Sequence, residues 1–339
     1  MLIATGVTRH MILAGDPDLE EVGKADRCRS VLRNAGTPVA EVTALARLCP
    51  EPDGRKHVSL LVGDKRQRHG TRAQAQEVTK SALVWRYAVP GGAFWRVNTP
   101  DDFPINELYV TSPPFECALR ARDLSVPELA LLMTVQCGTF RCSAADEDAR
   151  DGMLYGTGAW TTIKELNDFL ELAKGRWHGC RRYARALDYA LEGCASIPEA
   201  KTAIMLSVPR RLGGMGLGTP RVNEDVAIPG DILPLMEVRK SFRYDGEWGV
   251  NVDVEYNGWP HNDPDAMLDD MEKILASVGM GRIVLPVTRR TWESFERFEV
   301  FANILAAQSR ERPLPEPTSE MRAAQRALFE AFRDWDPLC

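Results

Sequence analysis

The sequence has no apolar run long enough to cross a membrane, and its start, MLIATGVTRHMILAG, has neither the basic residues nor the cleavage pattern of a secretory signal. Its 8 cysteines are scattered. The one close pair, Cys137 and Cys142, has no second Cys or His pair that would complete a zinc site. We therefore expect a soluble, cytoplasmic protein with buried, reduced thiols and no membrane partner.

The sequence also has fewer basic than acidic residues. The chain has 42 Lys and Arg against 48 Asp and Glu, a formal net charge of -6 that argues against a general nucleic-acid coat protein. The basic residues nevertheless gather in three segments, at 66–72, 176–185 and 210–221. Such a cluster is most often a solvated face, although a local patch can steer a polyanion onto an acidic protein.

The length of 339 residues and an apolar content of 44% suffice for two domains with separate cores. The pattern from Ala40 to Val110 is strand-like and precedes a helix at 125–136. The acidic, glycine-bearing stretch 143–158 then marks a boundary, and helical and strand patterns alternate beyond it. We predict an α/β fold of the α+β kind, with these parts: an N-terminal mixed α/β domain at 1–150, a second domain at 160–310 and, after a proline-rich linker, a C-terminal helix at 318–336.

Residues 244–256 have the pattern of an antiparallel hairpin closed by the turn Gly249-Val250-Asn251. That register places Asp245 opposite Glu255 and Glu247 opposite Asp253, although a turn of four residues would shift it. Four carboxylates then share one face, and we expect no cation on that face. Like charges across a strand pair repel each other, so a bound Mg²⁺ or Mn²⁺ is the simplest partner.

Two residues outside the hairpin extend this group. Ser196-Ile-Pro-Glu199 begins a helix, and Glu199 is explained equally well as part of a helix cap or as a catalytic acid. His261 lies between the hairpin and a helical segment at 262–279. A lone loop histidine is usually a surface residue, but here it could exchange protons or orient a metal-bound water. Acids with one histidine suggest phosphodiester hydrolysis.

These motifs resemble a known family. Ser196-Ile-Pro-Glu199, Asp245-Gly-Glu-Trp248, Glu255-Tyr-Asn-Gly258 and the segment 281–288 are similar to the restriction-endonuclease-like PD-(D/E)XK superfamily, in the branch related to very-short-patch repair endonucleases. Residues 112–140 resemble, more loosely, the N-terminal part of bacterial members, some described as abortive-infection antitoxin-like. The resemblance covers about 196–308. It implies a mixed sheet flanked by helices, DNA as partner and a role in bacterial defence.

Carried over to this sequence, the resemblance implies that Asp245 and Glu255 bind Mg²⁺ or Mn²⁺. Glu199 would support the metal and His261 would handle protons. The chain departs from the family pattern at Asn257, which replaces a carboxylate and leaves no lysine two residues after Glu255. Lys201 and Lys273 are the helix residues that would supply this missing charge.

The leading hypothesis is therefore a metal-dependent DNA endonuclease. The alternative is a catalytically weak or inactive nuclease-fold protein that acts as an antitoxin, a transcriptional regulator or a nucleic-acid-binding module, with a protein partner. A third hypothesis is a purely structural cation site.

Overall fold

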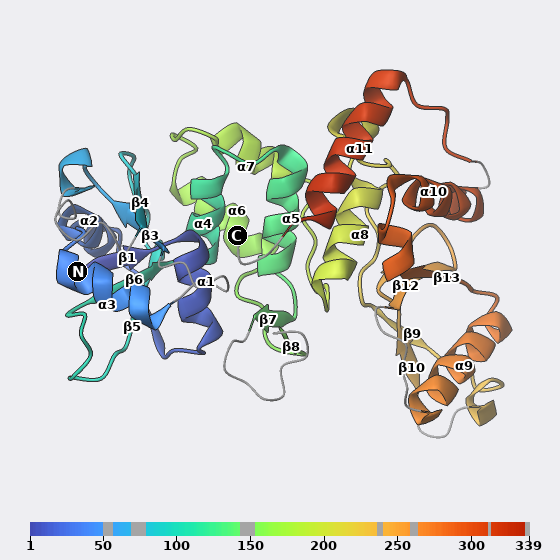
Figure 1. The fold of residues 1–339 in the computed structure, drawn as a ribbon. Helices are drawn as coiled ribbons and strands as arrows, with labels where there is room; N and C mark the ends of the chain where they lie inside the picture. The colour runs from blue at the N-terminus through green and yellow to red at the C-terminus, as the bar shows by residue number, and fades with distance from the viewer. Residues whose placement is uncertain are drawn as a thin grey trace. The chain divides into compact units, whose positions relative to one another are not determined.

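The computed structural model describes residues 1–49, 57–68, 79–142, 153–235, 240–257, 264–310 and 313–335. Its helices and strands confirm the predicted mixed α/β class (Figure 1). They form two compact units: Met1–Ser125 with Phe140–Leu187, and Val126–Thr139 with Asp188–Trp335. The chain thus divides at points other than the acidic stretch where we placed the domain boundary. Within the described residues, no helix has the length and apolarity needed to span a bilayer.

A six-stranded sheet forms the centre of the first unit. Its strands lie in the order β2-β5-β6-β1-β3-β4, with β1 parallel to β6 and β3 parallel to β4. Their bounds are β1 Leu2–Ala4, β2 Leu19–Glu21, β3 His57–Val62, β4 Thr79–Val84, β5 Phe94–Val97 and β6 Leu108–Thr111. The strands β3, β4, β5 and β6 confirm the strand-like pattern predicted between Ala40 and Val110 for these segments.

Helices complete the first unit. They are α1 Gly6–Ala14, α2 Ala25–Asn34, α3 Val39–Leu48, α4 Pro113–Arg120, α6 Ile163–Leu172 and α7 Cys180–Leu187, and a short hairpin pairs β7 Phe140–Cys142 with β8 Met153–Tyr155. The strand-like interpretation is wrong at α3. Val42, Leu45 and Ala46 are buried at helical spacing, so packing on the sheet outweighs the β propensity of the valines. The cysteines whose state is described are free, and most are buried, as expected.

The second unit surrounds a three-stranded sheet in the order β11-β12-β13, in which β12 runs antiparallel to β11 and parallel to β13. A separate antiparallel pair joins β9 to β10. The elements are α5 Val126–Gln136, α8 Ile197–Ser207, β9 Asp225–Ala227, β10 Ser241–Arg243, β11 Gly246–Glu247, β12 Val252–Asn257, α9 Pro264–Gly279, β13 Ile283–Thr288, α10 Phe295–Arg310 and α11 Ser319–Arg333.

The C-terminal helix α11 packs within the second unit. Its Phe329 stacks on Trp292, with ring centroids 5.1 Å apart and an interplanar angle of 9°. The same ring meets Phe298 from α10. Thr318 caps the helix by accepting a hydrogen bond from the Met321 N–H. Aromatic packing therefore holds the predicted C-terminal helix in the second unit.

The β11–β12 hairpin has the predicted register. Glu247 lies opposite Asp253, and Gly246 opposite Val254. The turn is closed by the Trp248 N–H, which donates to the Val252 carbonyl at 2.8 Å. Gly249 and Asn251 adopt positive φ angles of 70° and 60°, the conformation that Gly and Asn tolerate best. Asn257 ends β12.

Gly249→Ala tests this turn. A Cβ at position 249 would lie 2.6 Å from the Ser309 carbonyl oxygen, in a backbone conformation that alanine disfavours. We expect a loss of about 1–3 kcal/mol in the free energy of unfolding, measured by urea denaturation. Gly230→Ala is the matched control, because that position has open space and no positive φ. Equal stability of the two variants would contradict the turn described here.

Candidate active site

Three acidic residues that are far apart in the sequence converge in the second unit. Glu199 lies in the first turn of α8, Asp245 between β10 and β11, and Glu255 on β12. The charges of Glu199 and Glu255 both raise the pKa of Asp245, and the charge of Glu199 raises that of Glu255. The structure therefore brings together the three acids that the sequence singled out, and it places them in one electrostatic cluster.

Glu199 is held by the end of its own helix. Its carboxylate accepts hydrogen bonds from the Ala195 N–H at 2.7 Å and from the Ser196 hydroxyl at 2.9 Å, while Ser196 Oγ caps the Glu199 N–H. The Asn223 amide donates to the same carboxylate at 3.2 Å. The capping interpretation of Glu199 is thus confirmed. Burial nevertheless raises the pKa of Glu199, which shows that these donors compensate its desolvation only in part.

Asp245 is a buried acid of this cluster with a strongly raised pKa. Burial, followed by the charges of Glu199 and Glu255, raises the pKa of Asp245 to about 8. Its carboxylate accepts one hydrogen bond, from the Tyr256 N–H at 2.5 Å. Asp245 therefore holds a proton near neutral pH. Shifts of this size, produced by burial together with like charges, are typical of functional sites.

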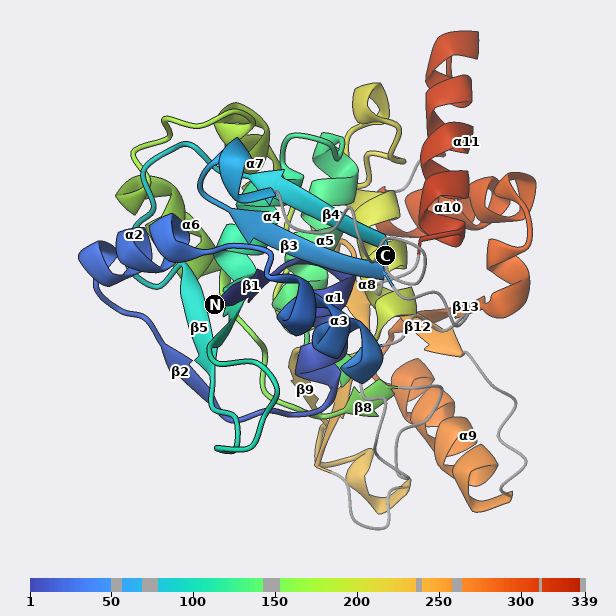
Figure 2. The same cartoon turned by 60° about the vertical axis from the view of Figure 1, so that its left-hand side comes forward.

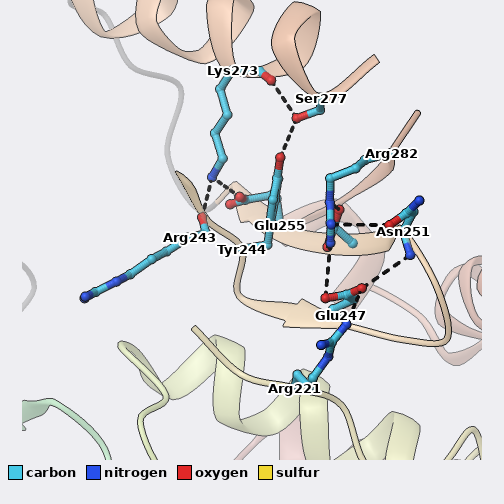
Figure 3. A network of polar contacts seen from close by, with 10 residues as sticks. Arg221, Arg243, Tyr244, Glu247, Asn251, Glu255, Lys273, Ser277 and Arg282 are labelled. Carbon is cyan, nitrogen blue, oxygen red and sulfur yellow. Dashed lines mark hydrogen bonds and ion pairs between the residues drawn. The ribbon is translucent and has the colours of Figure 1, made fainter. Parts of the chain in front are cut away.

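Glu255 forms an ion pair with Lys273 of α9 (Figure 3). Lys273 Nζ also donates to the Arg243 carbonyl at 2.7 Å and lies 4.8 Å from the centre of the Tyr244 ring. Despite this partner, burial raises the pKa of Glu255. The cation absent two residues after Glu255 is thus supplied from the helix. Lys201, the other candidate, instead donates to the Trp335 carbonyl.

The remaining two acids of the hairpin are bound by arginines. Arg282 Nε and Nη2 bind the two oxygens of Asp253, each at 2.7 Å, and Arg282 also lies 3.1 Å from Glu247. Arg221 completes the network with a 2.6 Å contact to Glu247 (Figure 3). Our interpretation that no cation serves this face is therefore wrong. Arg282 immediately precedes β13, and its pairing with β12 brings the guanidinium to these acids.

The donor chemistry of the cluster suits a hard divalent cation, because carboxylate oxygens are the ligands that Mg²⁺ and Mn²⁺ prefer. A cation there would relieve the repulsion that raises the pKa of Asp245. In the described part of the chain, however, no group of three or more His, Cys, Asp or Glu side chains is already arranged to hold a metal ion. His261, the predicted proton-handling residue, lies outside the described residues.

Sequence reasoning missed the partners of the acids. Asn223 carries no motif. Arg221 and Arg282 lie in segments that the sequence had marked, but neither was assigned to an acid, and Lys273 was one of two candidates. Ion pairs between distant elements leave no local spacing signal, so only the fold reveals them.

Comparison of this chain with protein-family models, with curated proteins and with solved structures finds no match. The expected relationship to the PD-(D/E)XK superfamily stays a prediction based on motifs. The site is therefore interpreted from the residues of this chain alone.

Arg282→Met tests the structural network. The variant leaves Asp253, whose side chain is fully buried, without the arginine that binds it, and leaves the nearly buried Glu247 with Arg221 as its remaining arginine. Removing one partner of a buried pair typically costs about 3–5 kcal/mol, and we expect a loss of this order in urea denaturation. Arg297→Met is the control, because its pair with Glu293 is more than half exposed and contributes little. A loss no larger than that of the control would show that the network does not stabilise the hairpin.

Asp245→Asn tests the raised pKa. The folded protein holds the Asp245 proton up to about pH 8, whereas the unfolded chain releases it near the ordinary value of 3.8. This group's contribution to stability is therefore largest below pH 4 and declines as the pH rises to 8. The variant should be more stable than wild type at pH 8 by on the order of 1–3 kcal/mol, with a smaller difference at pH 5.

Unfolding temperatures recorded from pH 5 to pH 8 measure this effect. Asp225→Asn is the control. Its pair with Arg243 lowers the pKa of Asp225, so the same substitution at this position should not stabilise the protein as the pH rises. A pH-independent difference between Asp245→Asn and wild type would refute the raised pKa.

Proposed function

We propose that this protein is a metal-dependent endonuclease that hydrolyses phosphodiester bonds of DNA. The observation that carries the proposal is the shared burial of Glu199, Asp245 and Glu255, which raises the pKa of Asp245 to about 8. Amide or apolar side chains at these positions would serve folding better than three acids that repel each other. Their presence indicates a function that needs concentrated negative charge.

The arrangement of elements around the acids supports the proposal. Glu255 lies on β12, the central strand of a mixed three-stranded sheet. The helix α8 carries Glu199, and α9, which connects the parallel strands β12 and β13, carries Lys273. A mixed sheet flanked by helices is what the resemblance to the PD-(D/E)XK superfamily implies. The free, buried cysteines suit a reducing compartment, so we place the reaction in the cytoplasm.

The three carboxylates would hold Mg²⁺ or Mn²⁺, which supplies an activated water and stabilises negative charge on the phosphate. Lys273 orients Glu255 and keeps a positive charge beside the acids, where the scissile phosphate would develop its extra negative charge. The Tyr256 N–H fixes one oxygen of Asp245. His261 stays the predicted proton-handling residue.

The second candidate function is a catalytically weak or inactive nuclease fold that serves as an antitoxin, a regulator or a nucleic-acid-binding module with a protein partner. Three observations favour it. Lys273 already pairs with Glu255, and the described residues include no ready-made group of metal ligands. Asn257, exposed at the end of β12, also provides an amide where the family motif has a charged residue.

Cleavage of supercoiled plasmid and of single-stranded DNA with Mg²⁺ or Mn²⁺ tests the enzyme. We expect Glu255→Gln and Asp245→Asn to lose about 100-fold or more of the rate, and Lys273→Met to lose activity as well, because each contributes to the charge arrangement. Glu293→Gln, at a surface ion pair, should cleave at the wild-type rate. Activity that survives in Glu255→Gln would contradict the assignment of the site.

Calorimetric titration with Mg²⁺ at pH 7 separates the two candidates. Binding should release the Asp245 proton, which appears as a dependence of the heat on the ionisation enthalpy of the buffer, and Asp245→Asn should abolish this dependence. Binding without cleavage would favour the non-catalytic candidate. If the wild type neither binds metal nor cleaves DNA, the nuclease proposal is refuted.

A further inference from the structure

A groove of about 540 Å³ lies in the first unit, far in sequence from the acids, at the carboxyl ends of the parallel strands β3 and β4. Figure 2 shows these two strands side by side. Gly63 and Asp64 follow β3, and the segment Trp85, Arg86 and Tyr87 follows β4. In open sheets with parallel strands, ligands bind in crevices outside the carboxyl ends of the strands.

The walls of this groove are basic. Arg29 and Arg33 from α2, Arg66 from the 3-10 helix after β3, and Arg86 line it, against one acid, Asp64. Arg29 pairs with Asp26, but no carboxylate of the described residues pairs with Arg33, Arg66 or Arg86. All three are exposed. In a chain with a net charge of -6, this concentration of unpaired guanidinium groups favours an anionic ligand.

An aromatic ring is presented among these arginines. The side chain of Tyr87 is 43% exposed, and its ring is held edge-on against Trp85 at a centroid distance of 5.2 Å. Trp85 is in turn packed edge-on against Phe115 at 4.9 Å. The Trp85 indole N–H is buried and finds no acceptor among the described residues. A rigid exposed ring beside exposed arginines suits a nucleic-acid base that stacks on it.

A second hollow of about 180 Å³ adjoins the groove. Both are lined by Trp85, Arg86 and Tyr87, and the second adds Arg122 and His178. Arg122 pairs with Asp123, so the second hollow adds His178 and a compensated arginine. A ligand that uses both hollows is longer than one nucleotide.

We propose that this groove binds a single strand of nucleic acid, with phosphates on Arg33, Arg66 and Arg86 and a base stacked on Tyr87. A duplex keeps its bases paired and stacked, so only an unpaired strand offers a base to the ring. The planar guanidinium fork matches phosphate oxygens. This site is distinct from the acids of the second unit and does not depend on their proposed chemistry.

Fluorescence anisotropy with the full chain, a labelled DNA oligomer and EDTA tests the groove. The oligomer has about 12 nucleotides, because single-strand-binding domains typically cover about 4–16 nucleotides. Arg66→Ala/Arg86→Ala should bind at least about tenfold more weakly and should lower the slope of log K against log salt by about 1.4, or 0.7 for each lost phosphate contact. The control is Arg27→Ala/Arg47→Ala, which removes the same charge from exposed positions that do not line the groove.

Tyr87 provides a second, independent readout. Tyr87→Ala should weaken binding by roughly 5- to 100-fold, whereas Tyr87→Phe should bind as wild type, because stacking needs the ring and not the hydroxyl. Wild-type unfolding temperatures of the variants show that the unit is intact. The same oligomer as RNA distinguishes the two sugars, and binding of either supports the groove.

Four outcomes would overturn the proposal. The first two are no binding by wild type at low salt and an equal loss of affinity for the oligomer in the two arginine double variants. The third is binding by Tyr87→Ala as tight as that of wild type. The fourth is a duplex or a mononucleotide that displaces the labelled oligomer as effectively as the unlabelled oligomer does. Because EDTA removes metal and no cleavage is measured, failure of the nuclease proposal leaves this result interpretable. Failure here likewise leaves the cleavage assay unaffected.

Discussion

The second unit depends on how it compensates the carboxylates that its hairpin buries. Glu247 and Asp253 face each other across β11 and β12, and both are almost completely shielded from water. Buried charges of one sign are unfavourable unless a cation lies beside them. Arg282 supplies it with a two-pronged contact to Asp253, and the strand pairing of β13 with β12 places that arginine. The guanidinium of Arg282, which lies between α9 and β13, therefore ties both elements to the β11–β12 hairpin.

The same hairpin has a second pair of acids whose compensation is incomplete. Asp245 and Glu255 share one lysine and lie near a third carboxylate, Glu199. The contrast between the two pairs is informative, because both are made by the same short segment. Where arginines match the acids, the cluster stabilises the fold. Burial raises the pKa of Asp253 despite Arg282, but it is Asp245, beside Glu199 and Glu255, whose pKa reaches about 8.

Much of the local structure could be predicted because it follows from periodicity and caps. The helix at 197–207 begins where Ser196 and its following proline place it, and the hairpin register followed from the positions of Gly249 and Asn251. The helix α3 was harder to predict. It contains β-branched residues, and it is helical because its apolar stripe packs on the sheet. The domain division was equally indirect, because compact units depend on contacts between distant segments.

The sequence by itself determined the hairpin, its acidic face and the helices on either side, because these depend on side-chain alternation and local hydrogen bonds. Only the tertiary structure decided which acids pair with arginines and which gather around Asp245. Arg221, Lys273 and Arg282 come from separate elements, and their distances to the acids depend on how β12, α9 and β13 pack. The basic groove has the same origin: β3 and β4 must pair in parallel before Arg66 and Tyr87 line one surface.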